Sequence, residues 1–119
     1  MPRRRSTSLT SSLEFERVYR EGSVYRGRLF SVHALPNGFG EPRLGLSVSK
    51  KVGSAVTRNG VRRRLKEIFR SSRDGLPGDL DLVVSARPAA AEASFQELDD
   101  EFSRSLSKIQ KTRGIGEGA

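Results

Sequence analysis

The chain has 119 residues, a formal net charge of +8 at pH 7, one histidine and no cysteine. Its length fits a single domain with a modest hydrophobic core, and the lack of cysteine excludes disulfides and the usual zinc sites. No apolar run approaches the roughly 18 residues of a membrane span, and no apolar segment follows the basic N-terminus as in a signal peptide, so we expect a cytoplasmic protein.

The N-terminal part predicts a basic arm followed by a short helix. Residues 1–8 contain three consecutive arginines and predict a flexible arm. Ser11 and Glu14 have the spacing of a capping box, which predicts a helix over residues 12–20 that ends at Gly22. The apolar residues of this helix are spread too widely for one narrow core stripe: Leu13, Phe15, Val18 and Tyr19. Either part of its aromatic surface stays available for binding, or both aromatic side chains are simply core.

Three strands are predicted next. Residues 23–25 form a short one, and residues 28–35 and 43–49 form two longer ones, separated by a turn rich in glycine and proline. Because side chains alternate between the faces of a strand, small or polar residues share one face of the two longer strands: Ser31, His33, Gly45, Ser47 and Ser49. We expect these two strands to be neighbours, with a shared polar face that suits close approach by a ligand backbone.

Residues 55–71 predict a helix with two different sides. At about 100° per residue, one arc is apolar and contains Val61, Leu65, Ile68 and Phe69. The flank beside this arc is cationic or polar and contains Arg58, Asn59, Arg62, Arg63, Lys66, Arg70 and Arg73. The helix therefore packs by one side and presents cations by the next.

The charge around this helix has one sign. Between Arg43 and Arg73, ten Lys or Arg stand against one acid, Glu67, a net +9 that accounts for the whole excess of the chain. Four of these cations repeat at i,i+4, where like charges destabilise a helix by about 0.2–0.5 kcal/mol each: Arg58, Arg62, Lys66 and Arg70. Charge runs are usually solvated surface, but such repulsion is tolerable where a polyanion neutralises it. We therefore predict a nucleic acid or another phosphate-rich partner.

The C-terminal part predicts one buried strand and one helix. A loop over residues 71–79 leads to the nearly continuous apolar run 80–86, as expected of a buried strand. Ser94 and Glu97 form a second capping box, which opens the last helix. The acids in its first turns are interpreted as solvated: Glu97, Asp99, Asp100 and Glu101. Residues 111–119 predict a flexible tail. The order of elements gives helices packed on one mixed sheet, an α+β fold class.

The stretch LGLSVSKKVGSAVTRNGVRRRLKE (residues 44–67), followed by VVSARP (residues 83–88), resembles the protein component of bacterial ribonuclease P. The KKVGSAVTRN core is specific, because families that share only a basic helix would not also share the preceding strand, its lysines and the glycine at fixed spacing. The resemblance implies a single αβββαβα domain over residues 9–110. Its mixed four-stranded sheet would be packed with helices, similar to the second domain of a small-subunit ribosomal protein.

The resemblance also implies a partner and a reaction. The chain would be the protein subunit of ribonuclease P, which binds the large catalytic RNA and the 5′ leader of precursor tRNA and assists endonucleolytic removal of that leader. The RNA subunit with its magnesium ions would carry the hydrolysis, so we expect no catalytic residue and no cofactor held by the protein alone. Neither a membrane nor an obligate protein partner is implied.

Two sets of site residues follow from the resemblance. Contacts to the catalytic RNA are implied for Lys50, Lys51, Arg58, Asn59, Arg62, Arg63, Lys66 and Arg70. The leader-binding cleft, formed by the first helix and the open face of the sheet, is implied for Phe15, Tyr19, His33, Ser47 and Ser49, with Arg87 as a basic position after the last strand. For a metal beside the basic helix the pattern gives no prediction.

Three positions depart from the family pattern. Gly60 stands where arginine is common, which removes a cation and costs about 1 kcal/mol of helix stability relative to alanine. Arg64 stands where the family often has an apolar residue, which would partly restore the charge. His33 replaces what is often tyrosine, so stacking there is expected to be weaker or sensitive to pH.

Two other functions stay open at this point. A ribosomal or general RNA-binding protein of the same fold would explain the charge but not the KKVGSAVTRN match. A stand-alone nuclease would cut RNA without an RNA subunit. The single histidine and scattered acids argue against the acid and base pair, or the metal site, that such a nuclease needs.

Overall fold

Among the residues that the structure describes, three helices and four strands make up the fold. The computed structural model of the protein describes residues 9, 11–38, 40–76 and 79–113. The elements follow in the order α1 (Ser12–Glu21), β1 (Ser23–Arg26), β2 (Phe30–Pro36), β3 (Arg43–Ser47), α2 (Ala55–Ser72), β4 (Leu80–Ala86) and α3 (Phe95–Arg113). Three short 3-10 turns lie between them: η1 (Lys50–Val52), η2 (Arg73–Gly75) and η3 (Pro88–Glu92). This order confirms the αβββαβα arrangement. The arm expected at residues 1–8 lies outside the described residues, and α3 includes the start of the segment expected as a tail.

The strands form one mixed sheet in the order β1-β2-β4-β3. β1 and β2 are antiparallel, as are β2 and β4, while β3 runs parallel to β4. The expectation that β2 and β3 are neighbours is therefore wrong. β4 lies between them because its residues 80–84 are buried, and such an apolar run is stable where helices or loops cover both faces of the sheet.

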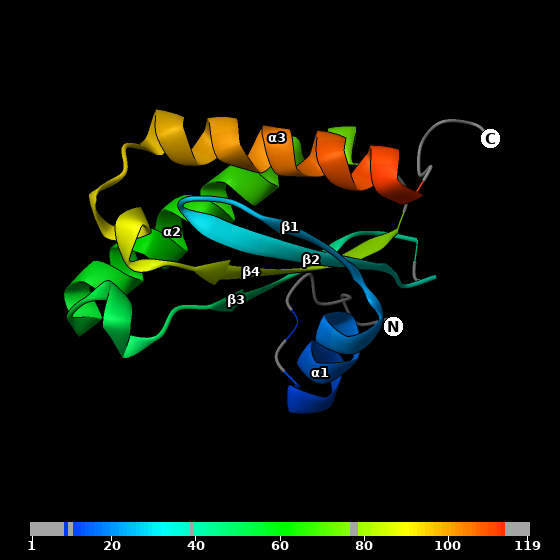
Figure 1. Ribbon diagram of the computed structural model, residues 1–119, viewed down its shortest axis with the longest axis horizontal. Helices are drawn as coiled ribbons and strands as arrows, with labels where there is room; N and C mark the ends of the chain where they lie inside the picture. Colours follow the sequence, from blue (N-terminus) through cyan, green and yellow to red (C-terminus); the bar gives the residue numbers. More distant parts are fainter. Residues whose placement is uncertain (1–8, 10, 39, 77–78, 114–119) are drawn as a thin grey trace, which may run out of the picture.

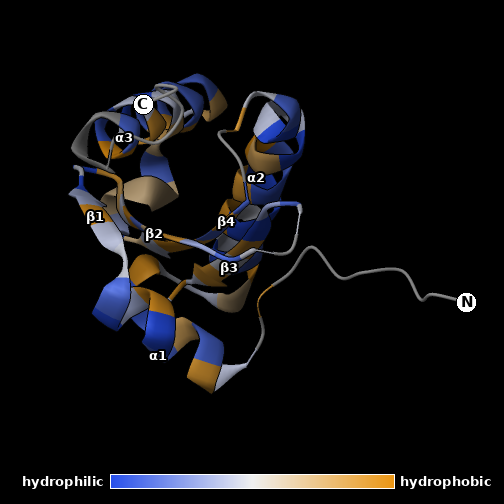
Figure 2. Ribbon diagram, turned by 90° about the vertical axis from the view of Figure 1, so that its right-hand side faces the viewer, coloured by the Kyte–Doolittle hydropathy of each residue, from blue (hydrophilic) through white to orange (hydrophobic). Residues whose placement is uncertain are grey.

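The helices lie on both faces of this sheet. α2 and α3 cover one face, and α1 lies alone against the other (Figure 1). Seen from the side, the sheet runs between these two helical layers (Figure 2). The larger core fills the space under α2 and α3, where Phe30, Leu82 and Phe102 are buried. Among the described residues, no helix is both long and apolar enough to cross a membrane. Because α1 alone lies on its side of the sheet, that face of the sheet is covered less than the face under α2 and α3.

α1 packs on the sheet through a second, smaller core. This core consists of Leu9, Val18, Leu35 and Val83, with Phe15 at its margin. Gly45 of β3 makes room for the contact, because a Cβ at this position would lie 2.7 Å from the Phe15 ring. Leu13 and Tyr19 stay outside, at 75% and 41% exposure. Of the two alternatives for the aromatic residues of α1, the exposed Tyr19 favours the one in which part of their surface stays available.

The two predicted capping boxes differ in the structure. At the start of α3, Ser94 N donates to Glu97 Oε1 at 2.8 Å and Glu97 N donates to Ser94 Oγ at 3.0 Å, so this box is complete. At the start of α1, Ser11 Oγ accepts from Glu14 N at 3.4 Å, but the Glu14 carboxylate accepts from Arg43 instead of returning to Ser11. The second half of that box is replaced by a tertiary contact.

One acid of α3 is buried, not solvated. Glu101 is 5% exposed, and its Oε2 accepts from the backbone N–H groups of Leu29 at 2.9 Å and Phe30 at 3.3 Å. A Cβ at Gly27 would overlap this oxygen, so glycine leaves room for the carboxylate. The interpretation of all four acids as solvated is wrong for Glu101, because the turn between β1 and β2 presents two buried donors that need an acceptor.

Candidate nucleic-acid interface

α2 presents its two sides as the sequence predicts. The predicted apolar arc is buried in full: Val61, Leu65, Ile68 and Phe69. Ser54 caps the helix, because its Oγ accepts a hydrogen bond from Thr57 N at 3.2 Å. Directly before the cap, Gly53 has a φ of 151°, a conformation that residues with side chains rarely adopt. The cap and this turn fix where the helix begins, and so which residues point outward.

The cationic strip is the polar flank of α2, and we define it as Arg58, Asn59, Arg62, Arg63, Lys66 and Arg70. Arg58 and Arg62 are half-buried, and the other four residues are exposed. Arg58 Nε donates to the carbonyl oxygen of Gly53 at 3.1 Å, which holds this guanidinium beside the start of the helix. Arg70 pairs with Glu67 at 3.0 Å. Among the described residues, no carboxylate lies within ion-pair distance of the remaining cations of the strip.

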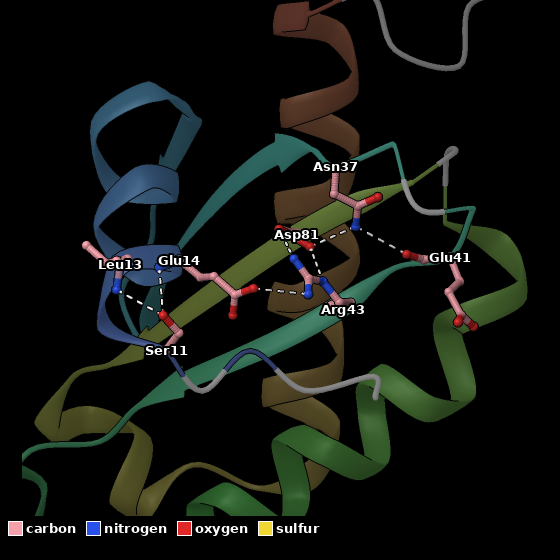
Figure 3. A network of polar contacts seen from close by, with 7 residues as sticks. All are labelled: Ser11, Leu13, Glu14, Asn37, Glu41, Arg43 and Asp81. Carbon is pink, nitrogen blue, oxygen red and sulfur yellow. Dashed lines mark hydrogen bonds and ion pairs between the residues drawn. The ribbon is translucent and has the colours of Figure 1, made fainter. Parts of the chain in front are cut away.

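Arg43 belongs to a partly buried polar network and not to the basic surface (Figure 3). Its guanidinium donates to both carboxylate oxygens of Asp81, at 2.9 and 2.8 Å, and to Glu14 at 3.2 Å. Asn37 donates to the same carboxylate of Asp81 at 2.7 Å. The hydrogen bonds to Asp81, which is only 3% exposed, raise the pKa of Arg43 above its ordinary value. Through Glu14, this network fastens α1 to β3 and β4.

Arg73 is also engaged within the protein. It lies in η2, beyond the end of α2, and pairs with Glu41 at 2.7 Å. The net charge counted between Arg43 and Arg73 thus overstates the charge available to a partner, because the cations at positions 43, 70 and 73 each have a carboxylate partner. The uncompensated charge is concentrated in the first three turns of α2 and just before it.

η1 adds two exposed cations, Lys50 and Lys51, between β3 and α2. Ser49 Oγ accepts from Lys51 N at 3.3 Å and starts this turn. η1 packs against η3, which begins directly after Arg87. Because β3 and β4 are parallel and end at the same edge of the sheet, the lysine pair lies at the same end of the molecule as Arg87.

An open groove of about 550 Å³ lies beside α1, lined by Ser12, Phe15, Glu16, Tyr19 and Ser47. The Tyr19 ring meets the Phe15 ring edge to face at 6.3 Å between centroids, and it meets the His33 ring of β2 at 4.8 Å. The Tyr19 hydroxyl lies 3.2 Å from Ser85 Oγ in β4. The three rings make a continuous aromatic edge from the helix to the sheet, on which unpaired bases can stack.

His33 is the titratable group on the sheet side of this groove. The side chain is half-buried, and its Nδ1 is shielded from solvent without a hydrogen-bond partner among the described residues. Burial lowers the pKa of His33 below its ordinary value, and the nearby Arg26 cation lowers it further. The imidazole is therefore neutral at pH 7, and it can gain a proton when an anion approaches.

Three serines and one arginine cross this face of the sheet in one line, which we call the serine row. The strand register pairs Ser47 of β3 with Ser85 of β4, Ser85 with Ser31 of β2, and Ser31 with Arg26 of β1. Neighbouring strands lie about 4.8 Å apart, so the row spans about 14 Å. The short serine side chains let a ligand come close to the backbone of the sheet. They also place hydroxyl groups at regular intervals along the row, with the Arg26 cation at one end.

Three of the predicted leader-site residues line the groove, Phe15, Tyr19 and Ser47, and His33 lies beside it in contact with the Tyr19 ring. Ser49 lies beyond β3, where it caps η1, and Arg87 lies beyond β4, where its Nε donates to the carbonyl oxygen of Gly27 at 2.8 Å. Among the described residues, no three His, Asp or Glu side chains are grouped so that they could hold a metal ion. The site is thus an aromatic groove on one face and a cationic helix on the other.

Comparisons with known proteins decide the family. The profile of the family Ribonuclease P matches residues 3–110. The chain belongs to this family. The ribonuclease P protein component of Caldanaerobacter subterraneus subsp. tengcongensis is 40% identical over 106 residues, covering 89% of this chain and 91% of that protein. The Streptococcus pneumoniae protein of the same name is 36% identical over 106 residues, covering 89% of this chain and 85% of that protein.

Solved structures of ribonuclease P proteins share the fold. The protein from Thermotoga maritima matches with a TM-score of 0.79 at 28% identity, covering 89% of this chain and 98% of that one. The protein from Staphylococcus aureus matches with a TM-score of 0.76 at 28% identity, covering 93% of this chain and 98% of that one. The resemblance seen in the sequence and the predicted fold class are therefore confirmed.

Two contributors to the ribonuclease P fold and groove were not singled out in the sequence, Asp81 and Ser85. A signal for Asp81 existed, because an acid inside an otherwise apolar strand calls for a cationic partner, and Arg43 opens the neighbouring strand. Ser85 carried no such signal. Its place in the serine row depends on β4 lying between β2 and β3, which the order of elements along the chain does not reveal.

Proposed function

We propose that the chain, as the protein component of ribonuclease P in tRNA processing, binds two RNA segments on two separate surfaces. The cationic strip, together with Lys50 and Lys51, contacts the catalytic RNA. The groove beside α1 receives the single-stranded 5′ leader of precursor tRNA. Membership of the ribonuclease P family supports the first partner, and the chemistry of the groove supports the second.

The uncompensated charge of the cationic strip is the observation that carries this proposal. Lys and Arg that neutralise phosphates release the counterions condensed on RNA, and this release drives binding without regard to sequence. Arg62, Arg63 and Lys66 have no carboxylate partner among the described residues, so their charge is available to a polyanion. The buried arc of α2 holds them on a rigid element, which suits a folded RNA of fixed shape.

The groove suits an unpaired RNA strand. Aromatic edges at Phe15, Tyr19 and His33 can stack bases whatever their identity, at about 1–3 kcal/mol per base. The serine row offers hydroxyl groups to phosphate and ribose oxygens along the same path. A leader should therefore be held with little preference for its sequence, because every base has a ring face that can stack.

The protein contributes position and charge, and the catalytic RNA with its magnesium ions contributes hydrolysis. This division follows the ribonuclease P family resemblance. Cations on the strip offset the repulsion between two RNAs, and the groove holds the leader so that the scissile phosphate of the precursor is presented to the RNA active site.

Two pairs of variants test the assignment of the surfaces. Arg58→Ala and Arg62→Ala should weaken binding of the catalytic RNA, whereas Phe15→Ala and His33→Ala should mainly weaken the preference for leader-bearing tRNA. Each variant is titrated separately with catalytic RNA alone and, once assembled, with precursor and mature tRNA. Equal losses for both ligands would defeat the two-surface assignment.

Reconstitution separates this function from the alternatives. At low magnesium, the purified chain should stimulate cleavage of precursor tRNA by a bacterial ribonuclease P RNA. The chain alone should not cleave the precursor. A ribosomal or general RNA-binding protein of the same fold would copurify with ribosomes and leave cleavage unchanged. The family match over residues 3–110 disfavours that alternative.

A further inference from the structure

Gly60 of α2 is buried, and the groups that lie over it are the side chains of two arginines. A Cβ built at this position would meet only two atoms within 4 Å outside the nearby backbone: Arg64 Nη1 at 3.5 Å and Arg63 Nη2 at 3.9 Å. Side chains on a helix lean toward its N-terminus, so residues three and four positions later lie over the turn that contains Gly60. Two guanidinium groups therefore lie over a residue without a side chain, and we call this arrangement of Gly60, Arg63 and Arg64 the Gly60 notch.

The notch gathers positive charge that the protein does not balance. Neither Arg63 nor Arg64 has an ion pair or a hydrogen bond among the described residues, and Arg64 Nε is shielded from solvent without a partner. The nearest acid along the helix, Glu67, pairs with Arg70. Like charges one turn apart or closer repel each other, so two converging guanidinium groups favour an anion between them. By contrast, the guanidinium of Arg43 donates to a carboxylate of the protein itself, that of Asp81.

We infer that the Gly60 notch binds one phosphate group of the RNA that meets the cationic strip, with Arg63 and Arg64 both donating to its oxygens. A planar guanidinium matches phosphate oxygens in pairs, and the missing Cβ lets both guanidinium groups lie against the helix, where one anion can reach the two together. The inference rests on the proposed function of the strip as an RNA surface. It adds Arg64, which lies outside the predicted contact set, and it gives Gly60 a role in binding.

A double-variant cycle tests whether one phosphate is shared. Arg63→Gln and Arg64→Gln are made singly and together in the full chain, and each is titrated with the catalytic RNA of a bacterial ribonuclease P. Each single change should weaken binding by about tenfold, because a hydrogen bond between charged groups is lost. The double variant should lose far less than the product of the two, because the second guanidinium loses its phosphate with the first. Losses that multiply would mean two independent contacts, and no loss for Arg64→Gln would mean no contact; either result overturns the inference.

A substitution that keeps the charge gives a second test. Gly60→Leu fills the notch and pushes the two guanidinium groups apart without changing the net charge, so it should also weaken RNA binding by about tenfold. Ser107→Leu places the same side chain on the exposed side of α3, and Arg104→Gln removes one cation there; both should bind as the parent chain does. Melting temperatures confirm that the variants fold. Parent-like binding by Gly60→Leu would overturn the inference.

Arg62→Ala separates failure of the notch from failure of the strip. If Arg62→Ala weakens binding and the four notch variants do not, the notch is wrong and the strip remains the RNA surface. If Arg62→Ala is without effect as well, the proposed function of α2 fails together with the notch.

Discussion

The cationic strip and the groove lie on opposite faces of one sheet, and they offer different chemistry to RNA. The strip carries charge without carboxylate partners at Arg62, Arg63 and Lys66, while the groove offers rings, hydroxyls and a neutral His33. Charge acts on any phosphate within about one Debye length, roughly 10 Å at 0.1 M salt. Aromatic side chains, in contrast, stack only on bases that are already unpaired. Under the proposed function, affinity for RNA and selection for a single strand would be placed on separate surfaces of a small domain.

Salt should separate the two surfaces most strongly. If the strip and η1 neutralise about six phosphates, the log-log slope for catalytic RNA lies near −4 to −5, a loss of roughly 300- to 1,000-fold between about 50 and 200 mM salt. The preference of the assembled complex for precursor over mature tRNA should change by less than about tenfold, because stacking involves no counterion release. Titrations over this salt range measure both quantities. Equal salt dependence of the affinity for catalytic RNA and of the preference for precursor tRNA would contradict the assignment of two separate surfaces.

Neutralising the centre of the strip should give the next largest effect. Arg62→Ala combined with Lys66→Ala should lower the affinity for catalytic RNA by about 100-fold, because each lost contact to a phosphate costs about tenfold. The preference for precursor over mature tRNA should stay the same. Arg104→Ala with Lys108→Ala removes the same charge from α3 and serves as the control. A similar loss in that control would mean that only net charge matters.

Removing the central ring of the groove should act on the leader alone. Tyr19→Ala should lower the preference for precursor tRNA by about tenfold, since one stacked base is worth about 1–3 kcal/mol. Tyr19→Phe keeps the ring and gives up only the contact with Ser85 Oγ, so most of the preference should remain. Competition between precursor and mature tRNA measures the effect. Equal losses in the two variants would point to the hydroxyl and not to stacking.

Weakening the attachment of α1 to the sheet should have a smaller effect on the preference for precursor over mature tRNA. Glu14→Gln removes the ion pair with Arg43, a partly exposed pair worth about 1 kcal/mol or less, while Arg43 keeps Asp81. The preference for precursor tRNA should fall about two- to threefold, because the helix that carries Phe15 and Tyr19 is held less firmly. Binding of catalytic RNA should not change, since α2 is anchored by its own core. A loss on the α2 side would show that the two surfaces are coupled.

The smallest expected effect concerns pH. Burial and Arg26 lower the pKa of His33, and a phosphate brought near the ring raises it again, so leader binding takes up protons. The affinity for the leader should therefore rise about two- to threefold as the pH falls from about 7.5 to 5.5. Binding is measured instead of cleavage, because hydrolysis has its own pH dependence. His33→Gln should give a flat profile, and a flat profile in the parent chain would contradict the linkage.

Local patterns in the sequence predicted the parts of the fold that are governed by periodicity. The apolar arc of α2 from Val61 to Phe69 is buried as expected, and the apolar run 80–86 forms β4 with the predicted bounds. The wide spread of four apolar residues over α1 raised available aromatic surface as one of two alternatives, and the exposed Tyr19 agrees with it. These features depend on neighbours within a few residues, so the sequence carries them directly.

The remaining features depend on contacts between distant residues. Arg43 looked like one more surface cation until β4 placed Asp81 beside it, and Glu101 looked solvated until the turn at Leu29 met α3. The small polar face was predicted on two strands, but its serine row needs β4 between them. Strand order, unlike periodicity, is set by how the whole core is covered, and a single sequence does not display it.

The central position of β4 also has a consequence for synthesis. A ribosome delivers β1, β2, β3 and α2 before the strand that joins them, so the growing chain exposes its arginines well before the sheet can close. Until β4 emerges, Arg43 lacks its acceptor at Asp81 and the groove lacks Ser85. Domains generally fold as units once their elements are available. Under the proposed function, binding of either RNA in its final geometry would therefore be a late event that has to wait for β4.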